Sequence, residues 1–369
     1  MLRITPPATI GIIGGGQLGK MMAYSLIRQG YKVAVLDPDM DCPCAHLAHH
    51  FICASYSDEN ALKELAEQSD ILTYEFENID VEMLKKVSRL DQVPQGYDCL
   101  SVSQDRYLEK STIQYLGVPT IRFEPFTTLE ELKDLSLNYP IVIKTRRLGY
   151  DGKGQIIIKN KEEIEFIELE FPHEYIAEEL CPFDTEISII ACGYKDGIIA
   201  YEPFENKHIN GILHTSIYPA QISKDLKDNA IEYTKKIIET FNYKGILAVE
   251  FFVKDNHLYF NELAPRPHNS GHGTIDSCDI SQFDSHVYAI TGSNRIIPKT
   301  FQYSLMQNIL GQDFNQVINK LKIKSNQSVH LHLYGKKENR DNRKIGHITF
   351  TSDNLEDVIE IAKEWRIKR

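Results

Sequence analysis

Glu250 and Glu262 are the two side chains whose type and spacing most directly predict a metal site. They are equidistant from Asn256, in the middle of a predicted hairpin turn, so an antiparallel ladder would place them opposite each other on one face. Facing carboxylates repel each other unless a cation neutralises them, and carboxylate oxygens are the ligands that Mg²⁺ prefers. Apolar residues flank both glutamates, which argues against the alternative of a solvated surface pair. We therefore expect both carboxylates to bind Mg²⁺, or Mn²⁺ in its place, beside a nucleotide polyphosphate.

A second candidate is a segment rich in glycine and basic residues that follows an apolar run at 141–144. Starting at Lys144, it has three glycines and four basic residues within twelve positions. Gly154 is followed by Gln155, so the segment does not have the Walker pattern of phosphate-binding loops. We expect a flexible hairpin that closes over a polyphosphate, with Lys144 neutralising phosphate charge. A solvated basic turn is the alternative.

The loop at 261–272 concentrates groups that titrate or bind phosphate. Arg266, His268 and His272 lie there among asparagine and serine, between prolines and glycines that restrict the backbone. Loops are usually polar, but seldom this rich in such groups. Nearer the C-terminus is a basic cluster for which the residues alone favour a solvated charge run; it comprises Lys336, Arg340, Arg343 and Lys344.

Gly14, Gly16 and Gly19 form a G-x-G-x-x-G pattern between a predicted strand and a predicted helix. Such glycines let the backbone approach a ligand, and the N-terminus of the helix offers free N–H groups to an anion. Asp37 ends the next strand, where a dinucleotide enzyme binds a ribose hydroxyl. The residues leave three interpretations open: a dinucleotide site, a site for another anion, or a tight turn without a ligand.

The secondary structure predicted to position these groups changes along the chain. Strands alternate with helices over the first hundred residues, which predicts a Rossmann-like α/β unit with a parallel sheet. We expect its strands at 8–14, 32–36, 51–54 and 71–74 and its later helices at 58–68 and 81–88. Short β-rich runs with glycine turns from 139 to 204 predict an antiparallel sheet. After a helix at 226–241, strands are expected at 245–252 and 257–263, and the last 75 residues mix helix and strand.

Composition narrows the functional classes. The chain has 369 residues, a net charge of −11 and seven cysteines. The acidic balance argues against nucleic acid as a partner. With no apolar stretch long enough for a membrane helix and no secretory signal, we expect a cytoplasmic protein with reduced thiols. Cys42 and Cys44 lack the usual zinc spacing, which leaves zinc as a minor alternative despite three nearby histidines, His46, His49 and His50.

Five strings of residues resemble the ATP-grasp superfamily, and within it the family of 5-(carboxyamino)imidazole ribonucleotide synthases. They are Gly-Gly-Gly-Gln-Leu-Gly at 14–19, Thr-Tyr-Glu-Phe-Glu-Asn at 73–78, Gly-Tyr-Asp-Gly-Lys-Gly-Gln at 149–155, Asn-Glu-Leu-Ala-Pro-Arg-Pro-His-Asn-Ser-Gly-His at 261–272 and Arg-Lys-Ile-Gly-His at 343–347. The string at 261–272 is the most specific. The resemblance implies three domains in an α/β (α+β) ATP-grasp fold: a Rossmann-like domain at 1–104, an ATP-grasp domain at 105–295 with a mobile subdomain at about 118–182, and a C-terminal domain at 296–369.

The resemblance also implies a nucleotide site. Arg106 and Lys144 would contact the phosphates of ATP. Glu186 would contact the ribose, and His208 would make a further contact with the nucleotide. Asn261 would lie beside the two metal ligands. The mobile flap would consist of Gly149, Tyr150, Asp151, Gly152, Lys153, Gly154 and Gln155. Adenine would pair mainly with the backbone of a hinge formed by Glu178, Glu179, Leu180 and Cys181.

For the second substrate, the resemblance implies that the glycine loop holds an imidazole ribonucleotide and not NAD. The neighbouring groups would be Gln17, Leu18, Glu75 and Glu77. The resemblance reverses the reading of the basic cluster, since the ribonucleotide phosphate would bind Lys336, Arg343 and Lys344. Arg266, His268 and His272 would lie between the γ-phosphate and the substrate amine, and the catalytic groups would be these three and Asp151 of the flap.

The implied activity is an ATP-dependent ligation in purine biosynthesis by a cytoplasmic homodimer. Bicarbonate and ATP would form carboxyphosphate, and 5-aminoimidazole ribonucleotide would capture the CO₂ released from it. Two alternatives remain. One is a formate-dependent glycinamide ribonucleotide ligase with the same phosphate apparatus, and the other is an NAD-dependent dehydrogenase built on the glycine loop and Asp37.

Overall fold

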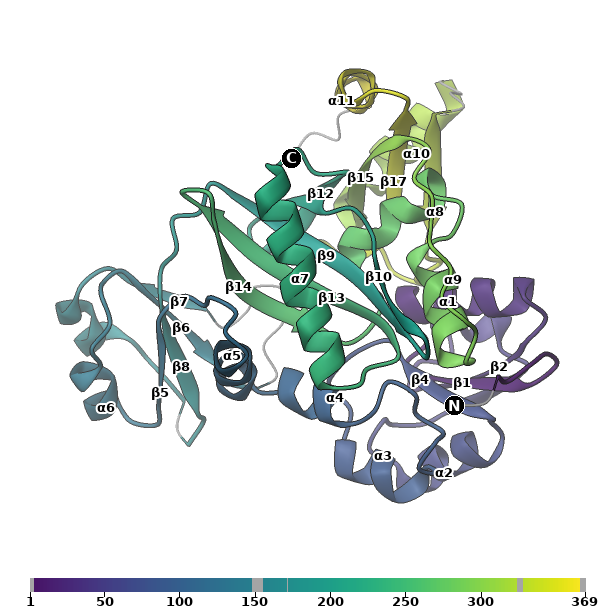
Figure 1. Cartoon of the computed structure of the whole chain (residues 1–369), viewed down its shortest axis with the longest axis horizontal. Coiled ribbons are helices and arrows are strands. Elements are labelled where there is room, and N and C mark those ends of the chain that lie inside the picture. Colours follow the sequence, from purple (N-terminus) through teal and green to yellow (C-terminus); the bar gives the residue numbers. More distant parts are fainter. Residues whose placement is uncertain (1–2, 148–154, 171, 324–327, 366–369) are drawn as a thin grey trace.

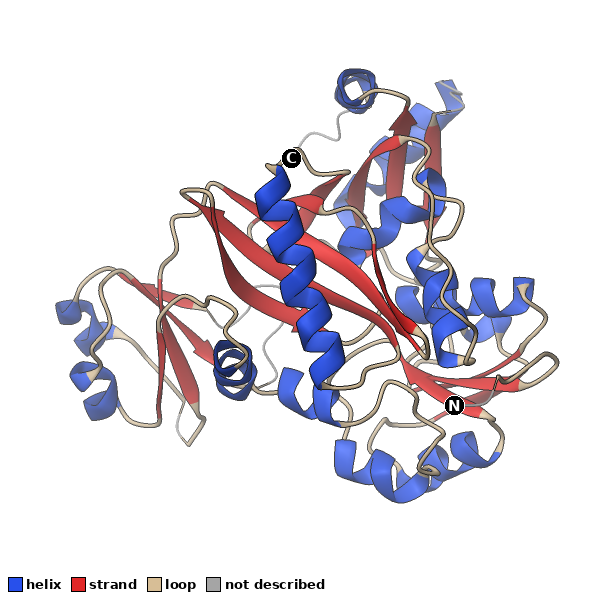
Figure 2. Cartoon of the chain, viewed as in Figure 1, coloured by secondary structure: helices blue, strands red, loops and turns tan. Residues whose placement is uncertain are grey.

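The computed structural model describes residues 3–147, 155–170, 172–323 and 328–365. Its strands form three sheets, of which the largest crosses the centre of the molecule (Figure 1). Helices lie against each sheet (Figure 2). Among the described residues, no helix is both long and apolar enough to cross a membrane.

The N-terminal sheet is parallel, with the strand order β3-β2-β1-β4. Its strands are β1 (Thr9–Ile13), β2 (Lys32–Asp37), β3 (His50–Cys53) and β4 (Ile71–Tyr74). The buried side chains on one face pack against helices α1 (Gln17–Arg28) and α9 (Gln282–Ile290), and those on the other face against α2 (Glu59–Glu67) and α3 (Val81–Val87). These elements confirm the predicted Rossmann-like unit to within one or two residues at most strand ends.

A second sheet is antiparallel, with the strand order β5-β8-β6-β7. Its strands are β5 (Phe123–Phe126), β6 (Ile141–Thr145), β7 (Ile156–Ile158) and β8 (Tyr175–Glu179). Apolar side chains from helix α6 (Leu129–Asp134) and from a 3-10 turn, Lys161–Phe166, cover one face. The predicted flap joins β6 to β7, but residues 149–154 lie outside the described part of the chain.

Two helices, α4 (Asp98–Ser103) and α5 (Arg106–Tyr115), connect the N-terminal sheet to the second sheet. Asp105 caps α5, because its carboxylate accepts hydrogen bonds from the N–H groups of Tyr107 and Leu108. The same carboxylate binds Arg146, just after β6, at 2.6 Å. The start of α5 and the end of β6 are therefore held together.

The largest sheet has nine strands, ordered β14-β13-β9-β11-β12-β15-β17-β16, with β10 paired to β9. They are β9 (Thr185–Tyr194), β10 (Gly197–Ala200), β11 (Phe204–Ile209), β12 (Ile212–Tyr218), β13 (Gly245–Lys254), β14 (His257–Ala264), β15 (Tyr303–Leu310), β16 (Val329–Leu333) and β17 (Lys344–Ser352). Helix α7 (Lys224–Thr240) packs on the face that includes Leu247, Val249 and Phe251. Alternation along β13 points Glu250 to the opposite face.

The predicted pairing of Glu250 with Glu262 is confirmed, but the turn is not centred on Asn256. Asp255 and Asn256 both have positive φ, as a two-residue type I′ turn requires, and Lys254 pairs with His257. A regular ladder from that turn would place Asn261 opposite Glu250. A β-bulge next to Glu250 shifts the register by one residue and brings Glu262 there instead.

The C-terminal strands continue the central sheet, because β15 pairs with β12 from Thr215–Gln307 to Tyr218–Ser304. Helices α10 (Phe314–Ile323) and α11 (Leu355–Glu364) contribute to the apolar cluster on this end of the sheet. A short helix, α8 (Thr274–Ser277), precedes α9. The nine-stranded sheet therefore extends without a break from β9–β14 into the C-terminal strands β15–β17.

Candidate active site

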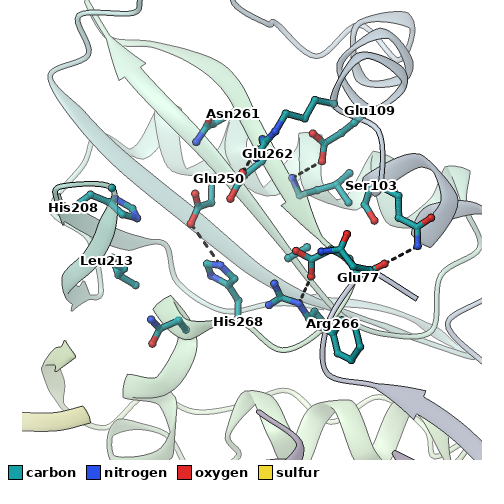
Figure 3. Close-up of a pocket in the computed structure, with 18 of the residues that line it drawn as sticks. Glu77, Ser103, Glu109, His208, Leu213, Glu250, Asn261, Glu262, Arg266 and His268 are labelled. Carbon is teal, nitrogen blue, oxygen red and sulfur yellow. Dashed lines mark hydrogen bonds and ion pairs between the residues drawn. The ribbon is translucent and has the colours of Figure 1, made fainter. Parts of the chain in front are cut away.

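A cavity of about 700 Å³ lies where the three sheets meet, and its lining comes from every part of the fold. Figure 3 shows its carboxylates and basic groups pointing toward one another from β13, β14 and the loops around them. The predicted residues that line it are Gln17, Leu18, Glu75, Glu77, Arg106, Lys144, Gln155, Glu186, His208, Glu250, Asn261, Glu262, Arg266, His268 and Lys344. The fold thus gathers most of the expected site from positions far apart in the sequence.

One wall of the cavity is acidic. Potential ligand atoms of Glu186, His208 and Glu250 all lie within 4.8 Å of one another. Burial, and then the carboxylates of Glu186 and Glu262, raise the pKa of Glu250 well above its usual range. Burial likewise raises the pKa of Glu186 to about 8. A divalent cation would remove this repulsion, so the chemistry of these carboxylates fits the metal that the sequence predicts.

Glu262 is more open than Glu250: its side chain is 44% exposed, against 7% for Glu250. One oxygen of Glu262 lies 3.3 Å from Nη1 of Arg106, on the first turn of α5. His268 Nε2 is 3.8 Å from Glu250 Oε1 (Figure 3). Each of the two paired glutamates therefore faces a basic group of the cavity wall.

Lys144, at the end of β6, lies 3.0 Å from Glu178 Oε1, and Lys110 from α5 lies 3.2 Å from Glu178 Oε2. Burial raises the pKa of the Glu178 carboxyl, but the two ammonium groups outweigh burial and lower that pKa to about 2. Glu178 is therefore an ionised, buried carboxylate held by two lysines. The family resemblance placed Glu178 in the adenine hinge through its backbone, and this side-chain arrangement was not predicted.

Like Glu178, the other three predicted hinge residues, Glu179, Leu180 and Cys181, do not line the cavity within the described residues. The N–H of Glu179 donates to the carbonyl of Arg122, and that of Leu180 to the carbonyl of Pro140. The Glu179 side chain pairs with Arg122 at 3.1 Å. Cys181, which follows, is half-buried.

The loop after β14 enters the cavity with Arg266, whose Nε donates to Glu77 at 2.6 Å (Figure 3). Glu77 in turn is fixed by Gln104, which donates to its backbone carbonyl at 2.7 Å. Burial would raise the pKa of Glu77, but the neighbouring guanidinium lowers it, so both partners are ionised. This pair joins the N-terminal sheet to the nine-stranded sheet across the cavity.

The glycine loop binds one of the chain's own carboxylates. Gly16 N–H donates to Glu75 Oε1 at 2.5 Å, and Gly19 N–H donates to Glu75 Oε2 at 2.7 Å. Asp37 accepts from Gly15 N–H and from the hydroxyl of Tyr56. These contacts occupy the groups that a pyrophosphate and a ribose would need, so they argue against the dinucleotide interpretation.

Some predicted residues lie elsewhere. His272 is buried outside the cavity lining, with its ring centroid 4.7 Å from that of His347, and burial lowers its pKa to about 3. Lys336 lies over the ring of Tyr334, and Arg343 Nη1 is 3.5 Å from the carbonyl of Glu338; neither lines the cavity. Outside the described residues lie Gly149, Tyr150, Asp151, Gly152, Lys153 and Gly154.

The zinc alternative is not supported by the contacts around Cys42 and Cys44. Both are buried free thiols, and burial raises the pKa of Cys42 to about 12. His49 Nδ1 accepts from the N–H of Val33, and His50 pairs with Glu64. The thiols are therefore protonated core groups, and two of the three histidines have other partners.

Sequence reasoning missed Glu109 and Lys110. Glu109 lines the cavity and accepts the N–H of Leu263, next to Glu262, at 3.0 Å (Figure 3). Burial raises the pKa of Glu109 to about 8. Both residues lie about one helical turn after Arg106, so the face of α5 that carries Arg106 was the signal that could have found them.

Comparisons with known proteins agree with this geometry. The profile of the ribonucleotide synthetase preATP-grasp domain matches residues 7–104, and that of the ATP-grasp domain matches residues 111–283. The profile of the phosphoribosylaminoimidazole carboxylase C-terminal domain matches residues 304–361. The N5-carboxyaminoimidazole ribonucleotide synthase of Staphylococcus aureus (strain MRSA252) is 44% identical over 359 residues, which cover 94% of this chain and 94% of that protein.

Solved structures give the same result. The N5-carboxyaminoimidazole synthetase of Staphylococcus aureus complexed with ADP has a TM-score of 0.92 and 40% identity, and covers 99% of this chain and 98% of its own. An Aspergillus clavatus N5-carboxyaminoimidazole synthase in complex with ADP and 5-aminoimidazole ribonucleotide has a TM-score of 0.87 and 26% identity, covering 97% of both chains. Its domains, its cavity and these relatives together show that the chain belongs to the N5-carboxyaminoimidazole ribonucleotide synthase family of ATP-grasp ligases.

Proposed function

We propose that this chain joins bicarbonate to the amine of 5-aminoimidazole ribonucleotide at the expense of ATP, in purine biosynthesis. As a member of its family it is a carbon–nitrogen ligase that uses ATP as co-substrate. The observation that carries the proposal is that one cavity combines basic groups for a polyphosphate, an acidic wall for a cation and loops of the N-terminal sheet for a second substrate. Bicarbonate as the carbon source follows from the family resemblance.

At the nucleotide end, Arg106 and Lys144 would bind the phosphates of ATP, and Gln155 would approach them from the flap. Glu186 and His208 line the same region and suit the ribose. Glu250 and Glu262 would hold Mg²⁺, or Mn²⁺, with Asn261 beside them. When bound, the metal would neutralise charge on the polyphosphate.

The chemistry would proceed in steps that conserve atoms and charge. A bicarbonate oxygen attacks the γ-phosphorus of ATP and ADP leaves, giving carboxyphosphate, while Lys144 and Arg266 stabilise the developing negative charge. Carboxyphosphate then breaks into CO₂ and phosphate. The exocyclic amine of the ribonucleotide attacks CO₂ to form the carbamate and loses a proton. His268 lines the cavity, and Asp151 belongs to the flap that the family resemblance implies, so these two are our candidates for accepting the proton.

At the ribonucleotide end, Gln17, Leu18, Glu75 and Glu77 would face the imidazole and ribose. Lys344 lines the cavity and would bind the phosphate. Lys336 and Arg343 come from the same C-terminal connection and would add positive charge around it. His272 is packed behind this region, and we give it a positioning role in place of the catalytic role expected from the sequence.

Several features of the proposal rest on the family resemblance and on composition. We place the domain boundaries near residues 104 and 295, with the second sheet as the mobile subdomain. We also propose a homodimer that works in the cytoplasm.

The proposal is tested by measuring ADP release with 5-aminoimidazole ribonucleotide, glycinamide ribonucleotide, bicarbonate and formate in all combinations. We expect release only when the imidazole ribonucleotide and bicarbonate are both present, with label from ¹³C-bicarbonate in the product. ADP release that requires formate and glycinamide ribonucleotide would overturn the proposal in favour of the formate-dependent alternative. Removal of divalent cations with a chelator should abolish release, and addition of Mg²⁺ should restore it.

A further inference from the structure

We propose that Lys110 is a positioning residue for the nucleotide: it neutralises Glu178, so that Lys144 is available to a phosphate. The inference rests on the proposed ATP site and adds a residue that lies behind it. Lys144 lines the cavity, whereas Lys110 and Glu178 do not. Lys110 therefore acts through Lys144 and does not touch the ligand.

The geometry places one carboxylate between two ammonium groups. Lys144 lies 3.0 Å from Oε1 of Glu178, and Lys110 lies 3.2 Å from Oε2, so each lysine has its own oxygen. Lys110 is only 1% exposed and Glu178 is 4% exposed. At this depth a lone charge of either sign is strongly unfavourable.

Charge balance explains why two lysines are needed. With one lysine, Glu178 would neutralise Lys144 completely, and a phosphate could recruit Lys144 only by leaving a buried carboxylate without a partner. With Lys110 present, Glu178 keeps a counter-ion when Lys144 turns to a phosphate oxygen. The three groups together carry one net positive charge, which favours binding of a polyanion.

Lys110 also connects the two sheets that enclose the nucleotide. Its ammonium group donates to the carbonyl of Asn261 on β14 at 3.1 Å and lies 5.8 Å from the centre of the Phe260 ring. Glu178 belongs to β8 of the second sheet. One side chain from α5 therefore joins β8 of the second sheet to β14 of the nine-stranded sheet.

The test compares ADP binding to the full chain by titration calorimetry for wild type, Lys110→Met and Lys110→Met/Glu178→Gln. We expect Lys110→Met to raise the dissociation constant roughly ten- to a hundredfold, the effect of losing one charged hydrogen bond to a phosphate. The double variant removes the buried carboxylate charge as well, leaves Lys144 free, and should bind ADP within about threefold of wild type. The control is Lys133→Met, which should bind ADP like wild type. Lys133 is an exposed lysine on α6, beside the second sheet, and its ammonium group lies 3.8 Å from Glu165.

A purely structural role for Lys110 would lower the melting temperature without changing ADP affinity, and this result would overturn the inference. So would a double variant that binds ADP as poorly as Lys110→Met. If Lys110→Met does not fold, two other variants still test the inference. Lys110→Arg keeps the charge, and both it and the double variant should bind ADP nearly as wild type does. Wild-type protein that binds ADP but releases none with imidazole ribonucleotide and bicarbonate would refute the proposed function and leave this inference standing.

Discussion

His286 is a buried histidine at the junction of α9, β4 and β13, and its protonation should weaken the fold by a predictable amount. Its Nδ1 accepts the N–H of Ile246 at 3.1 Å, so that nitrogen carries no proton. Its Nε2 lies 2.9 Å from the hydroxyl of Thr73, which itself donates to Gln95. The folded structure thus selects the neutral ring with the proton on Nε2. Burial lowers the pKa of His286 from 6.5 to about 3.

A histidine whose pKa is lower in the folded state takes up protons preferentially when the chain unfolds, so acid destabilises the fold. The loss begins as the pH falls through the unfolded pKa of about 6.5 and continues down to the folded pKa of about 3. At about pH 5.5 the linkage relation gives a cost of about 1.4 kcal/mol relative to about pH 8. This is the contribution of His286 alone, and other groups add their own terms to the total pH dependence.

The comparison that isolates this contribution is wild type against His286→Gln, whose side chain does not titrate. Urea denaturation followed by circular dichroism gives the free energy of unfolding of each protein at the two pH values. We expect the advantage of wild type over the variant to shrink by about 1.4 kcal/mol between about pH 8 and about pH 5.5. The same substitution at His257, the exposed first residue of β14, controls for loss of a histidine as such. A difference that is equal at both pH values would refute the assignment of His286 as a neutral buried ring.

Three further predictions concern the cavity. Glu262→Gln keeps the side-chain shape but removes a charge from the metal site, so turnover should fall by at least about a hundredfold with an unchanged circular dichroism spectrum; near-normal turnover would contradict the metal assignment. Lys344→Ala should raise the KM for 5-aminoimidazole ribonucleotide roughly ten- to a hundredfold in steady-state kinetics. The KM for ATP should stay unchanged. A rise in the KM for ATP alone would show that Lys344 serves ATP and not the ribonucleotide. Glu75→Ala removes the acceptor of two backbone N–H groups and should lower the free energy of unfolding by about 2 kcal/mol or more in urea denaturation, while Glu82→Ala, on an exposed helix face, should not.

The paired glutamates show how much of a strand pairing can be predicted by counting residues from a turn. Counting from a turn predicted the correct partners, although the turn lies between Asp255 and Asn256 and a bulge restores the pairing. Hairpin turns have local signatures, but a bulge depends on contacts made by the whole sheet. The alternation of strands and helices in the first hundred residues was equally local, and it predicted the N-terminal sheet well.

Side-chain partners between distant segments were harder to predict. The glycine pattern left a dinucleotide site, another anion site and a tight turn without a ligand all open. No local pattern shows that Glu75, more than fifty residues later, takes the N–H groups of this loop. Lys110 and Glu178 were likewise unpredictable as a pair, because α5 and β8 are brought together by tertiary packing. Burial of His272 also depends on a strand contributed by the C-terminal residues. Such contacts depend on the tertiary arrangement, which a single sequence reveals poorly.

The unbroken nine-stranded sheet has a consequence for folding of the chain during its synthesis on the ribosome. β12 obtains its outer partner only from β15, which begins at Tyr303, roughly 85 residues after β12 ends at Tyr218. At synthesis rates of about 5–20 residues per second, the backbone of β12 waits about 4–17 s with one edge unpaired. An unpaired edge is a template for another chain, so nascent molecules are most prone to aggregate in this interval. A C-terminal truncation before Tyr303 would make the interval permanent, and we expect such a fragment to accumulate in inclusion bodies.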